Sequence, residues 1–446
     1  MEQTCSKQVD IFEGGSGAVY GVIFKAQLLL FLVALLMIGF GNDIFGVALP
    51  TNVSTICILL SLLVQLVSGV FRIQLFLMVI FTYVVIQTFL FNYDEALFFR
   101  SVVHFAGLIL FSITIFSFIS AYRYRIPYII KMYYRFCFVI ASMAIIQSIV
   151  FIVFNKTISF QYILNGPQRP EMLPEIFGFF PRSPGIASEP ATFAIILMPG
   201  MYLSLLVLMG RGQSLLLKSR MAAIVILIAF ILTFSLVGYM GLILSILLLA
   251  IRSSSRVRLA AVFGALSIVF GLVFLFSSTI IVTKLTGLYS MTKNPQEYTY
   301  TTNDLSGFAL ISNALVAREA VLRSYYLGMG LNTHESTYDE TIDTLFDRSQ
   351  IIYELNKKDA GSLFIRLISE FGVPGLLLLL FFILRYKLVK CVPGSKLSII
   401  NDMCFVVIIC SCARSGNYFN IVFLLFSAIY LYSFILRRRS YRLRSV

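Results

Sequence analysis

The chain has 446 residues, of which 59% are hydrophobic and 13% are charged, and its formal net charge is +14. A soluble domain carries about 25% charged residues, so this composition excludes an ordinary soluble enzyme. Repeated apolar runs of about 20 residues, long enough to cross a hydrocarbon core of about 30 Å, indicate a polytopic helical membrane protein. The basic residues lie in short loops between these runs, which is the positive-inside pattern and argues against a nucleic-acid-binding surface.

Apolar segments predict twelve membrane helices, at about 22–40, 52–70, 73–91, 97–120, 133–155, 190–210, 221–234, 237–251, 259–283, 373–389, 398–413 and 418–436. Twelve crossings place both chain ends in the cytoplasm. The loops on that side then hold basic residues without acidic ones, whereas nearly every Asp and Glu falls on the opposite side. This separation of charge supports the topology.

This topology divides the chain into seven segments. They are a cytoplasmic lead at 1–21, five helices in 22–155, an outer loop at 156–189, four helices in 190–283, a large outer loop at 284–372, three helices in 373–436 and a basic cytoplasmic tail at 437–446. The first 20 residues lack the apolar core of a signal peptide, so we expect the first helix to remain as an anchor. None of the seven cysteines lies in the two long outer loops, and no Cys or His spacing fits zinc, so neither a disulfide framework nor a metal site is predicted.

Residues 221–251 contain no charge over a length of about 46 Å if they form one helix. Both flanks are basic and should lie on the same side, which requires an even number of crossings. We therefore expect a break near 235–238 that makes two short helices and lines the site, since irregular backbone at membrane depth needs protein or water around it. One long helix with a glycine kink is the alternative.

The large outer loop, 284–372, is the longest hydrophilic passage of the chain, and loops of this length are functional or disordered. Its GSLFIRLISEFG segment places Ser362, Arg366 and Glu370 at helical spacing. This pattern predicts an amphipathic helix that lies at the outer surface and ends at Gly372. Arg366 and Glu370 could also form a simple i,i+4 ion pair.

Arginines on the outer side run against the positive-inside bias. They are Arg182, Arg318, Arg323, Arg348, Arg366 and Arg414, with Arg100 at an outer helix end. Guanidinium groups bind phosphate in a bidentate manner, so several of them together would form a cradle for a diphosphate leaving group. Pairing with carboxylates of the same loops is the alternative for each arginine, and Arg182 could instead reach lipid headgroups.

Four residues are candidates for proton transfer: Glu189, Glu370, Asp359 and His334. Burial at a membrane surface can raise the pKa of a carboxylate enough for it to act as a base. His334 lies in a very polar run, so we expect it to be a solvated surface residue. Arg100 and His104 share a face of the fourth predicted helix, and intramembrane ionisable pairs are functional hypotheses.

Several passages fall on the outer side in this order: FFPRSPGIASEPATFA, TFSLVGYMGL, LGMGLN followed by DAGSLFIRLISEFGVPG, and CARSGNYF. They resemble motifs of the O-antigen polymerases (Wzy-type), of the O-antigen polymerase and ligase superfamily. The resemblance rests on their order and spacing and on their common placement on the outer side.

The resemblance implies a C-type glycosyltransferase-like fold in the bacterial inner membrane, with the large loop in the periplasm. Such enzymes move a growing glycan from undecaprenyl diphosphate to the non-reducing end of a lipid-linked repeat unit, without a cofactor. Implied partners are the lipid-linked glycans, membrane lipid and a chain-length regulator. Carried over by motif, the catalytic residues are Glu189, Glu370 and Arg182, and the substrate-binding residues are Arg182, Arg318, Arg366, Arg414, Tyr418 and Ser362.

Two other functions stay open. The related O-antigen ligases carry a His before the S-x-x-L helix, where this chain has Asp359 followed by Ala360, Gly361 and Ser362. A lipid-linked oligosaccharide flippase or other transporter would also have about twelve helices, but should show repeated broken helices near the bilayer midplane.

Overall fold

The computed structural model describes residues 17–37, 43–44, 47–48, 53–71, 75–91, 95–154, 175–176, 180–181, 183–187, 189–210, 215, 219–252, 264, 305–346, 355–389 and 395–442. Over these residues the chain is helical apart from two small antiparallel sheets of two strands each. Six of the described helices are long and apolar enough to cross a membrane, and four more are shorter and apolar. The predicted class, a helical multi-pass membrane protein, is confirmed. Twelve crossings remain a prediction, and of the helix expected at 259–283 all residues except 264 lie outside the described ones.

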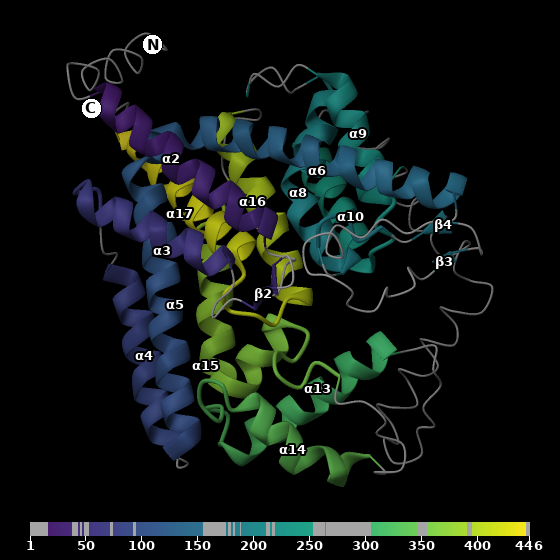
Figure 1. The fold of residues 1–446 in the computed structure, drawn as a ribbon. Helices are drawn as coiled ribbons and strands as arrows, with labels where there is room; N and C mark the ends of the chain where they lie inside the picture. Colours follow the sequence, from purple (N-terminus) through teal and green to yellow (C-terminus); the bar gives the residue numbers. More distant parts are fainter. Residues whose placement is uncertain are drawn as a thin grey trace.

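The elements follow one another in chain order (Figure 1). The first part contains α2 (Gly17–Leu36), β1 (Asp43–Ile44), β2 (Val47–Ala48), α3 (Val53–Val67), α4 (Leu75–Phe91), α5 (Glu95–Ala121), the 3-10 helix η2 (Arg123–Arg125) and α6 (Ile126–Phe154). The second part contains β3 (Glu175–Ile176), β4 (Phe180–Pro181), α8 (Pro190–Leu208), α9 (Arg220–Ile231), α10 (Leu236–Ile251), α13 (Leu305–Arg323), α14 (His334–Leu345), α15 (Leu363–Arg385), α16 (Lys396–Arg414) and α17 (Ile421–Arg442).

Helix α6 begins earlier than the sequence analysis predicted. We expected a helix at 133–155 with the basic residues before it in a loop, but the helix starts at Ile126. Pro127 occupies the first turn, where its missing N–H is not needed. The apolar residues between the basic ones are buried, for example Ile129, Ile130 and Tyr133. The basic run is therefore the exposed face of the first helical turns.

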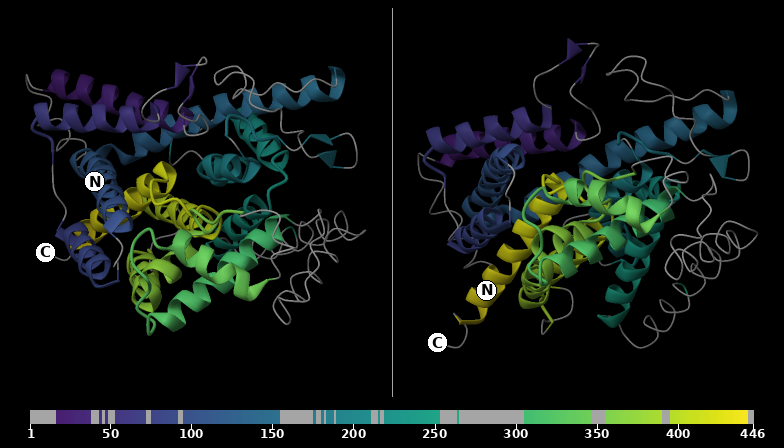
Figure 2. Two further views of the ribbon diagram at one scale, coloured as in Figure 1. Left: turned by 60° about the horizontal axis from the view of Figure 1, so that its bottom comes forward. Right: turned by 90° about the horizontal axis from the view of Figure 1, so that it is seen from below.

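Helix α8 lies at the centre of the bundle and is buried over most of its length. Small residues let its neighbours approach closely, as is usual between helices in membranes. A Cβ added to Gly200 would lie 2.7 Å from Cys137 Cβ of α6, and Tyr133 of α6 donates a hydrogen bond to the Ile196 carbonyl at 2.8 Å. Figure 2 shows α2, α3 and α6 together in one layer over the other helices.

The predicted break between α9 and α10 is confirmed. Helix α9 ends at Ile231, Phe234 has a left-handed φ of 43°, and the Ser235 hydroxyl accepts from the Gly238 N–H at 3.3 Å to cap α10. The Leu232 carbonyl accepts from the Ser183 N–H at 3.1 Å, so protein groups satisfy the interrupted backbone, as the membrane environment requires.

Contacts with α8 show that the chain reverses direction at this break. Ile226 of α9 lies beside Gly200 of α8, whereas Gly238 and Gly241 of α10 lie beside Ala194 and Met198. Helix α9 is therefore antiparallel to α8, and α10 is parallel to it. The reversal brings Arg220, at the start of α9, and Arg252, at the end of α10, to the same end of the bundle.

The two ends of the bundle differ in chemistry. At one end Arg252 forms an ion pair with buried Asp402, and Lys387 Nζ lies 2.6 Å from Asp402 Oδ1. A buried carboxylate needs such partners because burying an isolated charge is costly. At the other end lie Glu189 and Arg414, together with the cap, which we define as residues 305–346 with α13 and α14 (Figure 1). The charge bias predicts that the Asp402 end faces the cytoplasm.

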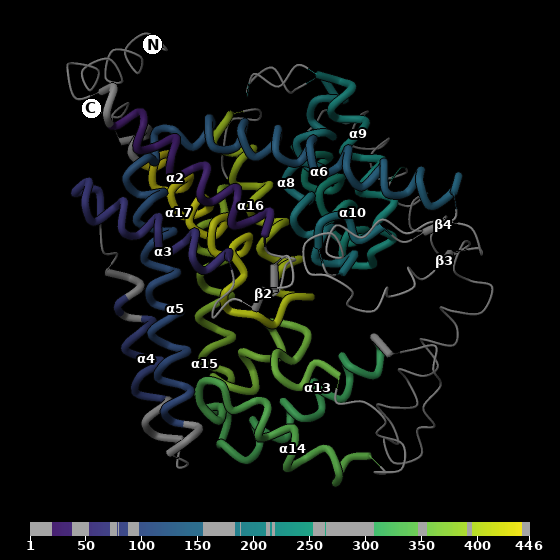
Figure 3. The backbone as a smooth tube through the Cα atoms, in the orientation of Figure 1, coloured from purple at the N-terminus to yellow at the C-terminus, as the bar shows by residue number. Residues whose placement is uncertain are grey.

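Helix α15 is interrupted at Gly372, as predicted, and the interruption receives a segment of the cap. Gly372 has φ 59° and ψ −157°. The cap segment 326–330 runs beside it, because Met329 N–H donates to the Ser369 carbonyl, Gly330 N–H to the Glu370 carbonyl and Val373 N–H to the Tyr326 carbonyl, at 2.8–3.0 Å. Figure 3 follows the backbone from α13 through α14 to α15.

We expect Gly372→Ala to destabilise the protein much more than Gly69→Ala. Gly69 has a left-handed φ of 65°, which costs alanine about 1–2 kcal/mol. Gly372, with φ 59° and ψ −157°, lies in a region that essentially only glycine adopts, so the backbone penalty for alanine is larger there. A Cβ at Gly372 would in addition run into the Tyr326 carbonyl, whereas nothing lies within 4 Å of one at Gly69. Apparent melting temperatures of the purified variants in detergent measure the difference, and equal losses would contradict the packing of 326–330 against this bend.

Candidate functional site

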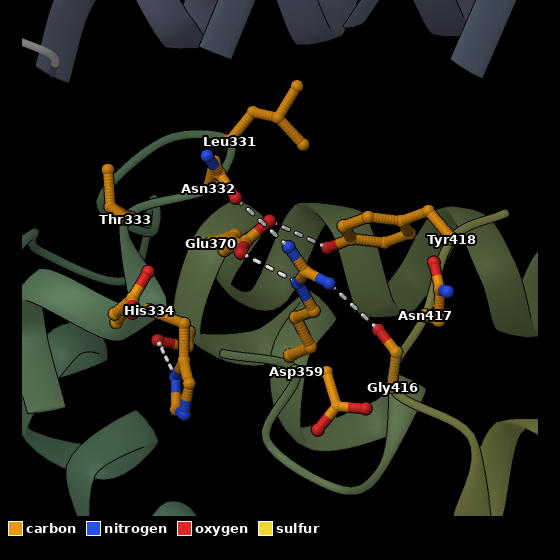
Figure 4. A network of polar contacts seen from close by, with 12 residues as sticks. Leu331, Asn332, Thr333, His334, Asp359, Glu370, Gly416, Asn417 and Tyr418 are labelled. Carbon is orange, nitrogen blue, oxygen red and sulfur yellow. Dashed lines mark hydrogen bonds and ion pairs between the residues drawn. The ribbon is translucent and has the colours of Figure 1, made fainter. Parts of the chain in front are cut away.

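Arg366 and Glu370 form a buried ion pair on the first part of α15. Arg366 Nε lies 2.8 Å from Glu370 Oε1, and the two side chains are only 4% and 0% exposed. The hydroxyl of Tyr418 donates to Glu370 Oε2 at 2.9 Å, so both carboxylate oxygens are engaged (Figure 4). The i,i+4 pair, given above as the alternative for these two residues, is confirmed, and the polar face of this helix is buried inside the protein.

The Arg366 guanidinium is held from several sides. It donates from Nη1 to the Gly416 carbonyl at 3.1 Å and from Nη2 to Asn332 Oδ1 at 3.3 Å. Its carbon lies 4.4 Å from the centre of the Tyr418 ring, in cation–π geometry. Arg366 therefore joins α15, the cap and the turn between α16 and α17.

Local backbone geometry brings these groups together. Asn332 has φ 66°, in the left-handed region that asparagine tolerates better than most residues. A Cβ on Gly416 would collide with the Asp359 carbonyl, so only glycine allows this approach of the turn to the loop before α15. Ser362 strengthens the same contact, because its hydroxyl donates to the Cys412 carbonyl at 3.0 Å.

Arg414 and Glu189 form a second ion pair, and this one is accessible. Arg414 Nη2 lies 3.0 Å from Glu189 Oε2, and the side chains are 32% and 53% exposed. Glu189 precedes Pro190 at the start of α8 and makes no capping hydrogen bond there. The turn from Arg414 to Tyr418 therefore carries one residue of the accessible pair and two contacts of the buried pair.

Tyr418 is fixed as a hydrogen-bond donor. Burial, followed by the negative charge of Glu370, raises the pKa of Tyr418 well above its usual value. The phenol thus stays protonated, and its proton points to Glu370 Oε2. Of the predicted binding residues, Tyr418 and Arg366 come together in this cluster.

His334 is buried, so the prediction of a solvated surface residue is wrong. Helix α14 begins at His334 and turns one face inward, including Thr337, Tyr338 and Thr341, although the run is polar overall. Its ring nitrogens Nδ1 and Nε2 each lie 2.9 Å from a partner, the Ser369 hydroxyl and Asn313 Oδ1 respectively.

These partners define the state of the His334 ring. The Asn313 amide nitrogen donates to the Ala309 and Leu355 carbonyls, which directs the amide oxygen to His334 Nε2. Nε2 must then carry the proton, and Nδ1 accepts from Ser369. Burial, followed by the charge of Arg366, lowers the pKa of His334 to about 3, so the neutral ring links the cap to α15.

Other predicted residues lie apart from the cluster. Arg318 is exposed on α13, and within the described part of the chain no hydrogen bond or ion pair joins it to another residue. Arg323 pairs with Glu340 on the cap surface at 3.3 Å. Arg100 pairs with Glu335 of α14 at 2.8 Å and not with His104, whose ring lies edge-on to Phe419. Arg182 and Arg348 lie outside the described residues.

Sequence reasoning missed several residues of the site. Gln87 of α4 donates to the Leu327 and Glu370 carbonyls, both at 2.7 Å, and so holds the cap segment against α15. A buried amide in an otherwise apolar helix is a signal that could have identified it. Asn332 and Gly416 offered no comparable signal, because their roles depend on backbone conformation.

Within the described ranges, no group of three or more His, Cys, Asp or Glu side chains is placed to hold a metal ion. The five described cysteines are free and buried. Comparison of the chain with models of protein families, with curated proteins and with solved structures found no match. The apolar helices define a multi-pass helical membrane protein, and the resemblance to the polymerases stays a prediction.

We expect Glu370→Gln to cost about 3–5 kcal/mol of stability, because it leaves the buried Arg366 charge without its partner. The same substitution in the accessible pair, Glu189→Gln, should cost at most about 1 kcal/mol. Thermal unfolding of the two variants in detergent compares them. A small effect of Glu370→Gln, similar to that of Glu189→Gln, would show that the Arg366 site is hydrated.

His334 should make the protein less stable at mildly acidic pH. In the unfolded chain the histidine takes up a proton near pH 6.5, but in the folded protein only near pH 3. Between these values the unfolded state binds more protons, so stability falls by up to about 1.4 kcal/mol per pH unit as the pH decreases. Melting temperatures between about pH 7.5 and pH 5 should fall less steeply for His334→Gln than for the wild type. Parallel profiles would contradict a neutral buried ring.

Proposed function

We propose that the protein is a glycan polymerase of the Wzy type in the bacterial inner membrane. It would transfer a growing chain from undecaprenyl diphosphate to the non-reducing end of a new lipid-linked repeat unit, at the periplasmic end of the bundle. The observation that carries the proposal is the turn from Arg414 to Tyr418, which joins an accessible and a buried arginine–carboxylate pair beneath the cap. All the motifs that resemble these enzymes contribute to this end or to the break at 232–235.

Arg414 is the described arginine best placed to bind the diphosphate. Its side chain is 32% exposed and its described ion-pair partner is Glu189, so a phosphate group could replace that carboxylate. A guanidinium presents two parallel donors to phosphate oxygens. It would stabilise the charge that develops on the diphosphate as the sugar leaves.

Glu189 is then the carboxylate available for proton transfer. Its side chain is half exposed, and binding of the diphosphate by Arg414 would release it. The acceptor hydroxyl oxygen forms a bond to the anomeric carbon of the donor, the bond from that carbon to the diphosphate oxygen breaks, and Glu189 takes the hydroxyl proton. The diphosphate leaves with the bonding electron pair and is held by Arg414.

Glu370 takes a different role from the one that the motif implies. Both of its oxygens are engaged, by Arg366 and by Tyr418, and the side chain is fully buried. A carboxylate in that position holds Arg366 and the turn in place and does not receive the substrate proton. Arg366 in turn fixes the Gly416 carbonyl, two residues from Arg414.

Substitution of Arg414 tests the proposal in cells of the source organism. Arg414→Ala should lower polymerisation roughly 10²-fold or more, because it removes the group that stabilises the leaving diphosphate, and surface glycan should then carry one repeat unit. Arg414→Lys should restore only part of the activity, because an ammonium group is not bidentate. Arg323→Ala is the matched control, since Arg323 also forms an exposed pair with a glutamate.

The length and attachment of the surface glycan distinguish a polymerase from a flippase and from a ligase. Long-chain glycan at normal levels with Arg414→Ala, at wild-type protein expression, would remove Arg414 from the mechanism. After deletion of the gene, single repeat units on the surface support a polymerase. Absence of all surface glycan would instead support a flippase, and polymer that is made but remains unligated would support a ligase.

A further inference from the structure

Two exposed tyrosines lie side by side in the turn that follows α13. The side chains of Tyr325 and Tyr326 are 86% and 59% exposed, and their φ angles are 51° and 69°. Bulky residues seldom adopt this left-handed conformation, and it persists only where surrounding contacts impose it.

Hydrogen bonds hold the turn in that conformation. Tyr326 N–H donates to the Val321 carbonyl at 2.8 Å, and its own carbonyl accepts from Val373 at 3.0 Å. The Ser324 hydroxyl accepts from the Gly328 N–H at 2.8 Å. The chain therefore presents two large aromatic side chains outward from a fixed backbone.

The turn lies at the end of an exposed apolar stripe on α15. Val373, Leu377, Phe381 and Leu384 recur at helical spacing, and each is at least 40% exposed. Because α15 is one of the six helices suited to crossing a membrane, we expect this stripe to face lipid. The hydrogen bond from Val373 to Tyr326 joins the first residue of the stripe to the turn.

On its other side the turn adjoins the charged surface of the cap. Arg323 directly precedes it and pairs with Glu340, and both side chains are exposed. The exposed surface thus changes from aliphatic on α15 to charged on the cap, with the two tyrosines between. Tyrosine favours such a boundary because its ring is apolar and its hydroxyl is polar, and the chain has no tryptophan for this role.

We propose that Tyr325 and Tyr326 form a membrane anchor whose rings insert into the headgroup region of the bilayer at the cap end. The ligand is the lipid surface itself and not a partner protein, because the turn continues the exposed apolar face of a helix suited to crossing a membrane. The anchor fixes the distance between the cap and the membrane, and through segment 326–330 it also fixes the position of Glu370. This inference rests on the membrane helices and not on the proposed reaction.

The absence of tryptophan from the sequence allows a direct test. Tyr325→Trp introduces a single fluorophore into the full-length protein, which is reconstituted in nanodiscs of phosphatidylcholine with bromine atoms either near the headgroup or deep in the acyl chains. Phe381→Trp on the lipid-facing stripe and Thr344→Trp on the exposed surface of α14 are the reference positions. Tyr326→Trp replaces Tyr325→Trp if that variant does not fold.

We expect Tyr325→Trp to lose most of its emission with bromine near the headgroup and less with deep bromine, and its emission maximum to shift to shorter wavelength than that of Thr344→Trp. Phe381→Trp should show the opposite preference for bromine depth. We expect neither brominated lipid to quench Thr344→Trp. If neither quenches Tyr325→Trp, position 325 does not contact lipid and the anchor is contradicted, even if a short emission wavelength shows that the fluorophore is shielded from water.

Discussion

The Arg366 guanidinium is removed from water, and the surrounding architecture follows from the need to compensate its charge. Glu370 supplies the opposite charge. The Gly416 carbonyl accepts a hydrogen bond from Arg366 Nη1 and the Asn332 side chain accepts one from Nη2, while the Tyr418 ring covers the face of the guanidinium. These partners come from α15, from the cap and from the turn after α16. A buried charge of this kind is weak evidence for added stability, but removal of a single partner is expensive, so the cluster specifies one relative position of the three segments.

This fixed position of the three segments explains why glycine is needed at several backbone positions near the site. The cap approaches α15 so closely that Gly328 and Gly372 have no room for a side chain, and Gly416 meets the Asp359 carbonyl in the same way. Gln87 and the neutral His334 supply hydrogen bonds to the same region without adding charge. The accessible pair of Arg414 and Glu189 lies beside this arrangement, so an exposed ion pair is placed next to a buried one.

Apolar length and charge bias were sufficient to predict the helices from α8 to α10 and the break between them, because membrane burial acts on whole segments. Prediction failed where the structure depends on which face of a helix is buried and not on the overall composition of the segment. The run that contains His334 is polar overall, yet helix formation buries the face that carries the imidazole. Likewise, the basic residues after Tyr122 suggested a loop, although the apolar residues between them repeat at helical spacing. The pairing of Arg414 with Glu189, separated by 225 residues, and the left-handed backbone at Asn332 depend on tertiary packing, which no local pattern contains.

Asp402 has a consequence for how this molecule can move. Its carboxylate binds Arg252 at the end of α10 and Lys387 just beyond α15, while it lies itself on α16. These ion pairs hold three helix ends together at the end of the bundle remote from the cap, whereas α15 bends at Gly372 near the cap end. Because these ion pairs hold the helix ends together around Asp402, we expect any separation of the helices to open toward the cap, the end at which we propose that substrate binds.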